Sequence, residues 1–229
     1  FLESNWLTKM ASSQRADEMV AKAEKRLKAW ALFASTNKHE DAAELYAKAA
    51  NLYKAQKLWD KAGTSYETAA ACHLKNSSPH EAATAYQDAA NAFKKTDADR
   101  AVLLYKEAVA VQIDLGRFTT AAKLQKEIAD IHEASGNLNA AMEAYQTAAD
   151  YYQGEEATSS ANQCLLKVAG FAAGAADYKR AIEIYEQVAI SSLDSTLLKW
   201  SVKGYLLCAG ICHLASGELG SASAALERY

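Results

Sequence analysis

The chain has 229 residues, half of them apolar, with one proline, ten glycines and a formal net charge of −3. This composition allows a substantial core, and the charge excludes a generally basic nucleic-acid-binding protein while leaving room for a local basic patch. No apolar run reaches the length of a membrane span, and the four cysteines have no Cys-x-x-Cys spacing, which is typical of a reducing, cytoplasmic compartment.

The first residues of the chain match nothing that follows them. We expect residues 1–9 to be a non-native or disordered leader, because Met10 followed by Ala-Ser-Ser resembles a natural start. A single domain is then expected over residues 10–229. Its first helix is predicted from Ser13 to Lys28, with small and apolar residues along one face.

The segment after the first predicted helix is apolar, whereas connectors between helices are usually polar. It contains Trp30, Leu32 and Phe33. Two interpretations remain open from the residues alone: these side chains cover the end of the first hairpin, or they form an exposed loop that enters a membrane or a partner's groove. Four cations directly precede the segment and would suit an anionic lipid surface, namely Lys22, Lys25, Arg26 and Lys28.

The rest of the chain is typical of a series of helices. Asn37 and Ser78 each begin a capping-box pattern, with a glutamate three residues later, and Pro79 takes a first helical position. Gly116 and Gly136 lie where the C-terminal glycines of helices belong. After the helix that begins at Asn37, helices are predicted over residues 57–75, 79–95, 99–115, 117–135, 137–153, 157–174, 177–192, 195–216 and 219–229.

One repeated unit organises these helices. In Ala42-Ala43-Glu44-Leu45-Tyr46-Ala47-Lys48-Ala49-Ala50, two pairs of alanines flank a tyrosine on one helix face. The unit returns about every 20 residues, so that two units make a helical hairpin of about 40 residues. We therefore predict an all-α fold, a right-handed α-solenoid of antiparallel helical hairpins of the tetratricopeptide-like kind, with about 20 residues per helix.

The sequence contains little that is typical of an enzyme. It has neither a phosphate-binding glycine loop nor a nucleophile motif. Cys208, Cys212 and His213 cluster, but two further ligands at a usable spacing are missing, so we interpret the cysteines as small core residues. We predict no catalytic residue, no metal site, no cofactor and no enzymatic activity.

Charge is distributed unevenly among the repeats. Residues 40 apart share a face of the predicted solenoid, which places Lys123 and Lys203 in one column, with Gln163 between them and Lys167 one turn beyond. Arg117 opens the helix that carries Lys123, and the intervening helices have glutamates at the equivalent positions. Such a column can be a solubilising surface, but its segregation favours an elongated acidic partner such as a bundle of acidic helices. Two adjacent lysines at a helix end either complement the helix dipole or extend the column, namely Lys94 and Lys95.

Several long motifs are more specific than the repeat. They are Ala92-Phe93-Lys94-Lys95, Gly116-Arg117-Phe118-Thr119, Gly154-Glu155-Glu156-x-x-Ser159-Ser160-Ala161-Asn162-x-Cys164-Leu165-Leu166-Lys167-Val168-Ala169-Gly170 and Leu197-Leu198-Lys199-Trp200-Ser201. On these motifs the chain resembles, from about Ala16 to Tyr229, the soluble NSF attachment protein (SNAP) family.

The resemblance implies an adaptor that acts in vesicle fusion and intracellular transport. Several SNAPs wrap the four-helix SNARE bundle, made of syntaxin-like and other SNARE helices, and recruit the hexameric ATPase NSF, which separates the bundle. The protein would then be cytoplasmic and peripheral on the cytosolic face of a membrane, with Trp30, Leu32 and Phe33 at the position of the family's membrane-binding loop. The positions that match SNARE-contacting cations are Lys94, Lys95, Arg117, Lys123, Lys167 and Lys203, whereas Gln163 replaces a cation that is common in the family.

Two further expectations follow from the comparison with this family. Its members continue past the position of Tyr229 into a helical bundle whose acidic C-terminus engages NSF, so we expect a truncated chain that binds SNAREs but couples poorly to NSF. The alternative function is a tetratricopeptide-like scaffold that clamps a short peptide. Such clamps use a compact cluster of cations, whereas the cations of this chain are spread over several hairpins.

Overall fold

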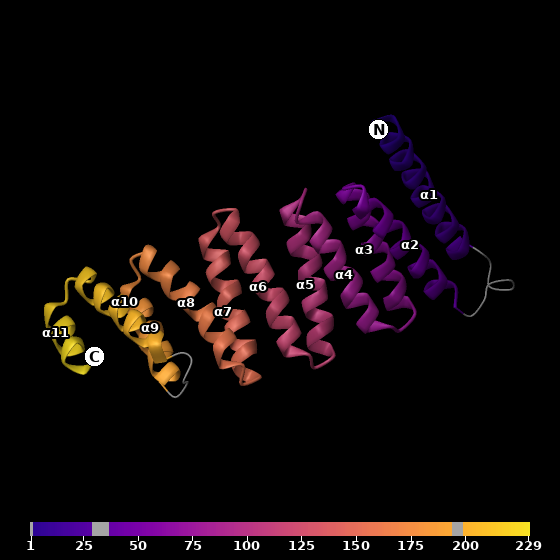
Figure 1. Cartoon of the computed structure of the whole chain (residues 1–229). Coiled ribbons are helices and arrows are strands. Elements are labelled where there is room, and N and C mark those ends of the chain that lie inside the picture. Colours follow the sequence, from indigo (N-terminus) through magenta and orange to yellow (C-terminus); the bar gives the residue numbers. More distant parts are fainter. Residues whose placement is uncertain (1, 29–36, 194–198) are drawn as a thin grey trace. The chain divides into compact units, whose positions relative to one another are not determined.

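The computed structural model describes residues 2–28, 37–193 and 199–229, and every regular element in these ranges is a helix (Figure 1). This confirms the predicted all-α fold. The elements are α1 (Leu2–Lys28), α2 (Lys38–Ala55), α3 (Trp59–Lys75), α4 (Pro79–Phe93), α5 (Ala98–Asp114), α6 (Phe118–Ala134), α7 (Leu138–Gly154), α8 (Thr158–Gly174), α9 (Tyr178–Leu193), the 3-10 turn η1 (Lys199–Ser201), α10 (Val202–Ala215) and α11 (Leu219–Arg228).

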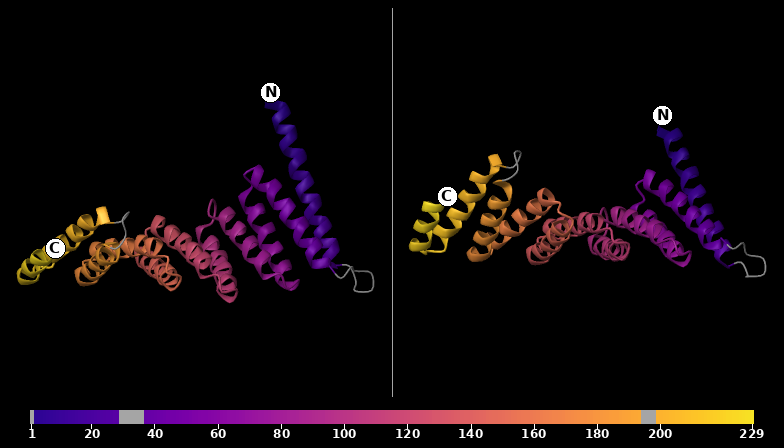
Figure 2. Two further views of the ribbon diagram at one scale, coloured as in Figure 1. Left: turned by 60° about the horizontal axis from the view of Figure 1, so that its bottom comes forward. Right: turned by 90° about the horizontal axis from the view of Figure 1, so that it is seen from below.

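The chain divides into two compact units, Phe1–Leu124 and Gln125–Tyr229. In the first unit each helix from α1 to α5 packs against the next, and in the second unit the same holds from α7 to α11. Figure 2 shows these successive helices from two further directions. The predicted single domain over residues 10–229 stays a prediction.

The core of the first unit is built on the alanine pairs of the repeat. Ala42 and Ala43 of α2 and Ala69 and Ala70 of α3 are completely buried, and they form one cluster with Tyr46. Alanine side chains let neighbouring helices approach closely, and the tyrosine fills the space that they leave. The alanine pairs and the tyrosine that define the repeat in the sequence therefore form the core of this unit.

Ion pairs also join some helices to the next helix but one. In the first unit, Lys61 of α3 reaches Asp17 of α1 at 3.1 Å, and Arg100 of α5 reaches Glu67 of α3 at 2.6 Å. Alternate helices of this unit thus form a layer of their own, as expected for stacked hairpins.

Most turns between the helices share one geometry. At the end of α5, for example, the amide of Gly116 donates to Ile113 and that of Arg117 to Gln112, as in a Schellman motif. Gly116 and Gly136 have φ values of +68° and +75°, which confirms their predicted role. Other repeats place ordinary residues in the same left-handed conformation, namely Lys57, Ser77, Glu156 and Ala176.

The structure differs from the predictions at four helix starts. α1 begins at Leu2 rather than Ser13, because no glycine or proline interrupts the chain between them. Asn37 and Ser78 precede helices as predicted, but neither side chain forms a cap hydrogen bond. The helix predicted from residue 195 begins at Val202, after η1; apolar periodicity defines the buried face of a helix more sharply than its first residue.

Candidate functional site

Arg117 is positioned by the turn between α5 and α6. Its backbone amide donates to the carbonyl of Gln112 at 2.8 Å, directly after the left-handed Gly116. The exposed guanidinium lies against the first turn of α4, where Nη1 is 3.1 Å from His80 Nδ1. This contact fixes the direction of Arg117 without neutralising its charge.

Lys123 lies in the second turn of α6, six residues after Arg117. It is exposed, while Ala122 and Leu124 beside it are buried, so the packing of α6 directs Lys123 to solvent. In the part of the chain that the structure describes, no carboxylate forms an ion pair with Lys123. Arg117 and Lys123 therefore place two uncompensated positive charges at one end of α6, about 9 Å apart along the helix.

Lys94 and Lys95 lie at the opposite end of α4 from His80. Lys94 follows the last residue of α4 and the amide of Lys95 donates to the carbonyl of Ala92, so both side chains project from the α4–α5 turn. His80, which contacts Arg117, lies at the start of the same 15-residue helix. At 1.5 Å per residue this separates the two sets of cations by about 22 Å, so they do not form one compact cluster.

Lys167 of α8 has a different environment in the second unit. Its Nζ lies 2.7 Å from Glu133 Oε1 of α6 and 5.9 Å from the centre of the Tyr145 ring. The Tyr145 hydroxyl donates to Asp130 and, at 2.6 Å, to Glu133. Hydrogen bonds from Lys167 and Tyr145 lower the pKa of the Glu133 carboxyl, while burial and these carboxylates raise the pKa of Tyr145. Lys167 is thus a half-exposed member of an internal network.

Lys203, on the first turn of α10, borders a cavity of about 480 Å³ in the second unit. Its apolar wall includes Ile190 and Leu193 of α9, which are 67% and 59% exposed. On the other side, Arg228 and the Tyr229 hydroxyl both bind Glu186. No carboxylate of the described residues pairs with Lys203, so a free cation lies beside an apolar surface.

The residues that hold Lys167 were missed by sequence reasoning. The sequence signal for them is a polar residue 14 or 15 positions before the tyrosine of the repeat. In α3 and α5 the tyrosine hydroxyl donates to such a residue, Tyr66 to Asn51 and Tyr105 to Asn91. Asp130 precedes Tyr145 by the same interval. The predicted membrane-binding residues Trp30, Leu32 and Phe33 lie outside the described residues.

The described residues contain no group of three histidine, cysteine or acidic side chains that could hold a metal ion. Among them, no helix combines the length and apolarity that crossing a membrane requires. Their exposed cations can bind an acidic surface by charge.

Comparison with known proteins identifies the family to which the chain belongs. The chain matches the family model described as "Soluble NSF attachment protein, SNAP" over residues 14–229. It is 47% identical over 216 residues to an alpha-soluble NSF attachment protein of Vitis vinifera, covering 94% of this chain and 74% of the relative. It is 46% identical over 199 residues to the human alpha-soluble NSF attachment protein, covering 86% of this chain and 67% of the relative. It is 35% identical over 223 residues to the vesicular-fusion protein SEC17 of Komagataella phaffii, covering 93% of this chain and 75% of the relative.

Solved structures support the fold. BtubC (BKLC) from P. vanneervenii superposes with a TM-score of 0.52 at 15% identity, covering 96% of this chain and 87% of that one. A signal-transduction ATPase with a tetratricopeptide repeat sensor from Pyrococcus horikoshii gives 0.54 at 13% identity, covering 96% of this chain and 36% of that one. The tetratricopeptide-like fold predicted from the repeat is confirmed. On the match over residues 14–229 and on the identity to its relatives, the chain belongs to the soluble NSF attachment protein family.

Proposed function

We propose that this chain is an adaptor that binds the assembled SNARE four-helix bundle and recruits the NSF ATPase to it in vesicle fusion and intracellular transport. The family match over residues 14–229 carries the proposal. Relatives that are similar over nearly all of this chain are named for NSF attachment or for vesicular fusion. These names describe attachment and fusion rather than an enzymatic reaction.

Each unit carries exposed cations that can contact an acidic rod. Arg117 and Lys123 extend from one end of α6, while Lys94 and Lys95 extend from the far end of α4. In the second unit, Lys203 is exposed and Lys167 retains half of its side chain in solvent. Spacing cations over several helices suits a partner with many carboxylates along its length better than a clamp around one peptide terminus.

The proposal includes contact with a membrane. Trp30, Leu32 and Phe33 are too few to span a bilayer, yet each apolar side chain contributes about 1.5–3 kcal/mol when it leaves water. Several copies on one membrane-anchored SNARE bundle would add these contributions through effective concentration. The adaptor would then act at the cytosolic face as a peripheral protein.

A pulldown separates the adaptor from the peptide-clamp alternative. The immobilised chain is presented with assembled SNARE bundles, with unassembled SNARE proteins and with short C-terminal peptides, each over a range of salt concentrations. We expect capture of the assembled bundle, weakening as salt screens exposed charges over about 8 Å at physiological ionic strength. NSF should be retained weakly, and only when the bundle is present. Capture of peptides but not of bundles would contradict the proposal.

A further inference from the structure

The end of α1 carries more positive charge than its internal ion pairs neutralise. Arg26 Nη1 lies 2.7 Å from Asp41 of α2, and Lys28 Nζ lies 3.9 Å from Glu24. Lys22 and Lys25 are exposed, and no carboxylate in the described part of the chain pairs with either of them. Two cations of this helix are therefore available to an outside anion.

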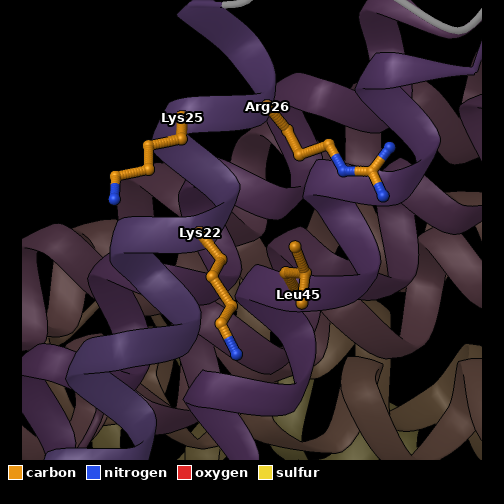
Figure 3. Close-up of a pocket in the computed structure, with 4 residues that line it drawn as sticks. All are labelled: Lys22, Lys25, Arg26 and Leu45. Carbon is orange, nitrogen blue, oxygen red and sulfur yellow. The ribbon is translucent and has the colours of Figure 1, made fainter.

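An open pocket of about 420 Å³ lies between α1 and α2, and Lys22 and Lys25 border it (Figure 3). Its lining consists of Lys22, Lys25, Arg26 and the half-buried Leu45 of α2. Figure 3 shows Leu45 between Lys22 and Arg26, with Lys25 extending outward. The pocket thus combines three cations with an apolar wall and has no acidic lining residue.

The helix dipole does not account for this arrangement. Cations stabilise the last turn of a helix, and Lys25, Arg26 and Lys28 occupy that turn. Lys22 lies one turn earlier, where the effect has largely decayed. Within the described ranges, its positive charge therefore contributes neither an ion pair nor much dipole stabilisation to the fold.

We propose that Lys22 and Lys25, beside the paired Arg26, bind the headgroups of anionic phospholipids. A headgroup matches both parts of the pocket, since its phosphate meets the cations and its glycerol and upper acyl chain meet Leu45. Lysines act as flexible point charges and suit a laterally mobile lipid surface better than one fixed carboxylate. The inference rests on the proposed membrane contact and names the lipid class that this contact requires.

The test is flotation of the chain with vesicles of phosphatidylcholine alone or of phosphatidylcholine mixed with phosphatidylserine. The variant is K22Q with K25Q, because glutamine keeps the helix propensity and removes only charge. Each cation near an anionic surface contributes about 1 kcal/mol, so we expect binding to the serine-containing vesicles to fall about 30-fold. The matched control is K106Q with K179Q, two exposed lysines outside the pocket that give the same change in net charge; it should bind as the wild type does.

The arms of this test distinguish the possible failures. Equal wild-type binding to both vesicle types would overturn the lipid-class inference while leaving the membrane contact in place. A wild type that floats with neither vesicle type would overturn the membrane contact and this inference together. Capture of soluble SNARE bundles should be unaffected by K22Q with K25Q, and its loss would assign the pocket to the acidic protein partner instead.

Discussion

Lys123 and Lys167 are both exposed lysines predicted to contact the same partner, but their surroundings differ. Lys123 has no carboxylate partner among the described residues, so its full charge is available to an approaching acidic surface. Lys167 bonds to Glu133 at 2.7 and 3.0 Å. Binding through Lys167 therefore requires exchange of an internal ion pair for an external one. The two lysines should respond differently to substitution.

Lys123→Glu should weaken capture of the SNARE bundle without lowering stability. An exposed ion pair contributes about 0.2–1 kcal/mol, and reversal replaces attraction by a repulsion of similar size, so a loss of affinity of about 2- to 30-fold is expected. The control is Lys106→Glu, which reverses another exposed lysine outside the proposed site. Affinity by surface plasmon resonance and the Tm by circular dichroism check both parts. Equal affinities for the two variants would remove Lys123 from the site.

Lys167→Met should lower the Tm at neutral pH, because it removes the cation that holds Glu133. A loss on the order of 1 kcal/mol corresponds to about 2–4 °C in a chain of this size. The pKa of Glu133 is lowered by its bonds to Lys167 and Tyr145, so this stabilisation is present above the ordinary glutamate value of about 4.3 and is lost as pH falls through the lowered value.

The Tm difference between Lys167→Met and the wild type should therefore shrink at acid pH. Lys106→Met is the matched control, and its Tm should equal that of the wild type at pH 7 and at pH 3. A difference for Lys167→Met that is as large at pH 3 as at pH 7 would show that Glu133 is not its origin.

At the scale of the helix and its turn, one backbone position recurs with different residues. Gly136 and Ala176 end α6 and α8 in the same left-handed conformation, with φ of +75° and +61°. A Cβ added at Gly136 would meet no atom within 4 Å, so only backbone preference separates glycine from alanine there. The glycines are visible in the sequence as turn signals, whereas Ala176 is not.

Ala176→Gly should stabilise the chain and Gly136→Ala should destabilise it. The left-handed conformation costs an alanine about 1–2 kcal/mol, and the extra unfolded-state entropy of glycine offsets about 0.5–1 kcal/mol of the gain. We expect opposite shifts, each of up to about 1 kcal/mol, in urea unfolding. Shifts of the same sign would mean that side-chain contacts, rather than φ, govern these turns.

At the scale of the whole chain, the sequence predicts what the repeat controls. The starts of α4 to α9 lie within one residue of their predicted positions, because alanine spacing and turn residues agree there. The predicted start of α1 was wrong because that part of the helix lies outside the repeat. The predicted start of α10 was wrong because no comparable turn signal marks its first residue. The exposure of Lys123 followed from periodicity. The pairing of Lys167 did not, because Glu133 is 34 residues away on a different helix.

Gly63 allows a test of how far a local defect spreads along such a chain. A Cβ at this position would lie 2.5 Å from Cε2 of Phe93, whose side chain is 1% exposed. The guanidinium of Arg100 lies over the Phe93 ring, 4.1 Å from the ring centre, and it forms an ion pair with Glu67. The phenyl ring therefore has little room to move, and overpacking of this kind costs about 1–3 kcal/mol.

Gly63→Ala should raise hydrogen exchange most in α3 and α4. In a repeat protein each helix is stabilised mainly by its neighbours, so the loss should decline along the chain and leave α8 and α9 nearly as protected as in the wild type. Hydrogen–deuterium exchange followed by mass spectrometry resolves these segments. Gly174→Ala is the control, because a Cβ there would meet no atom within 4 Å. A uniform loss of protection from α2 to α10 would mean that the chain unfolds as one cooperative body, and the nearest-neighbour account of its stability would have to be abandoned.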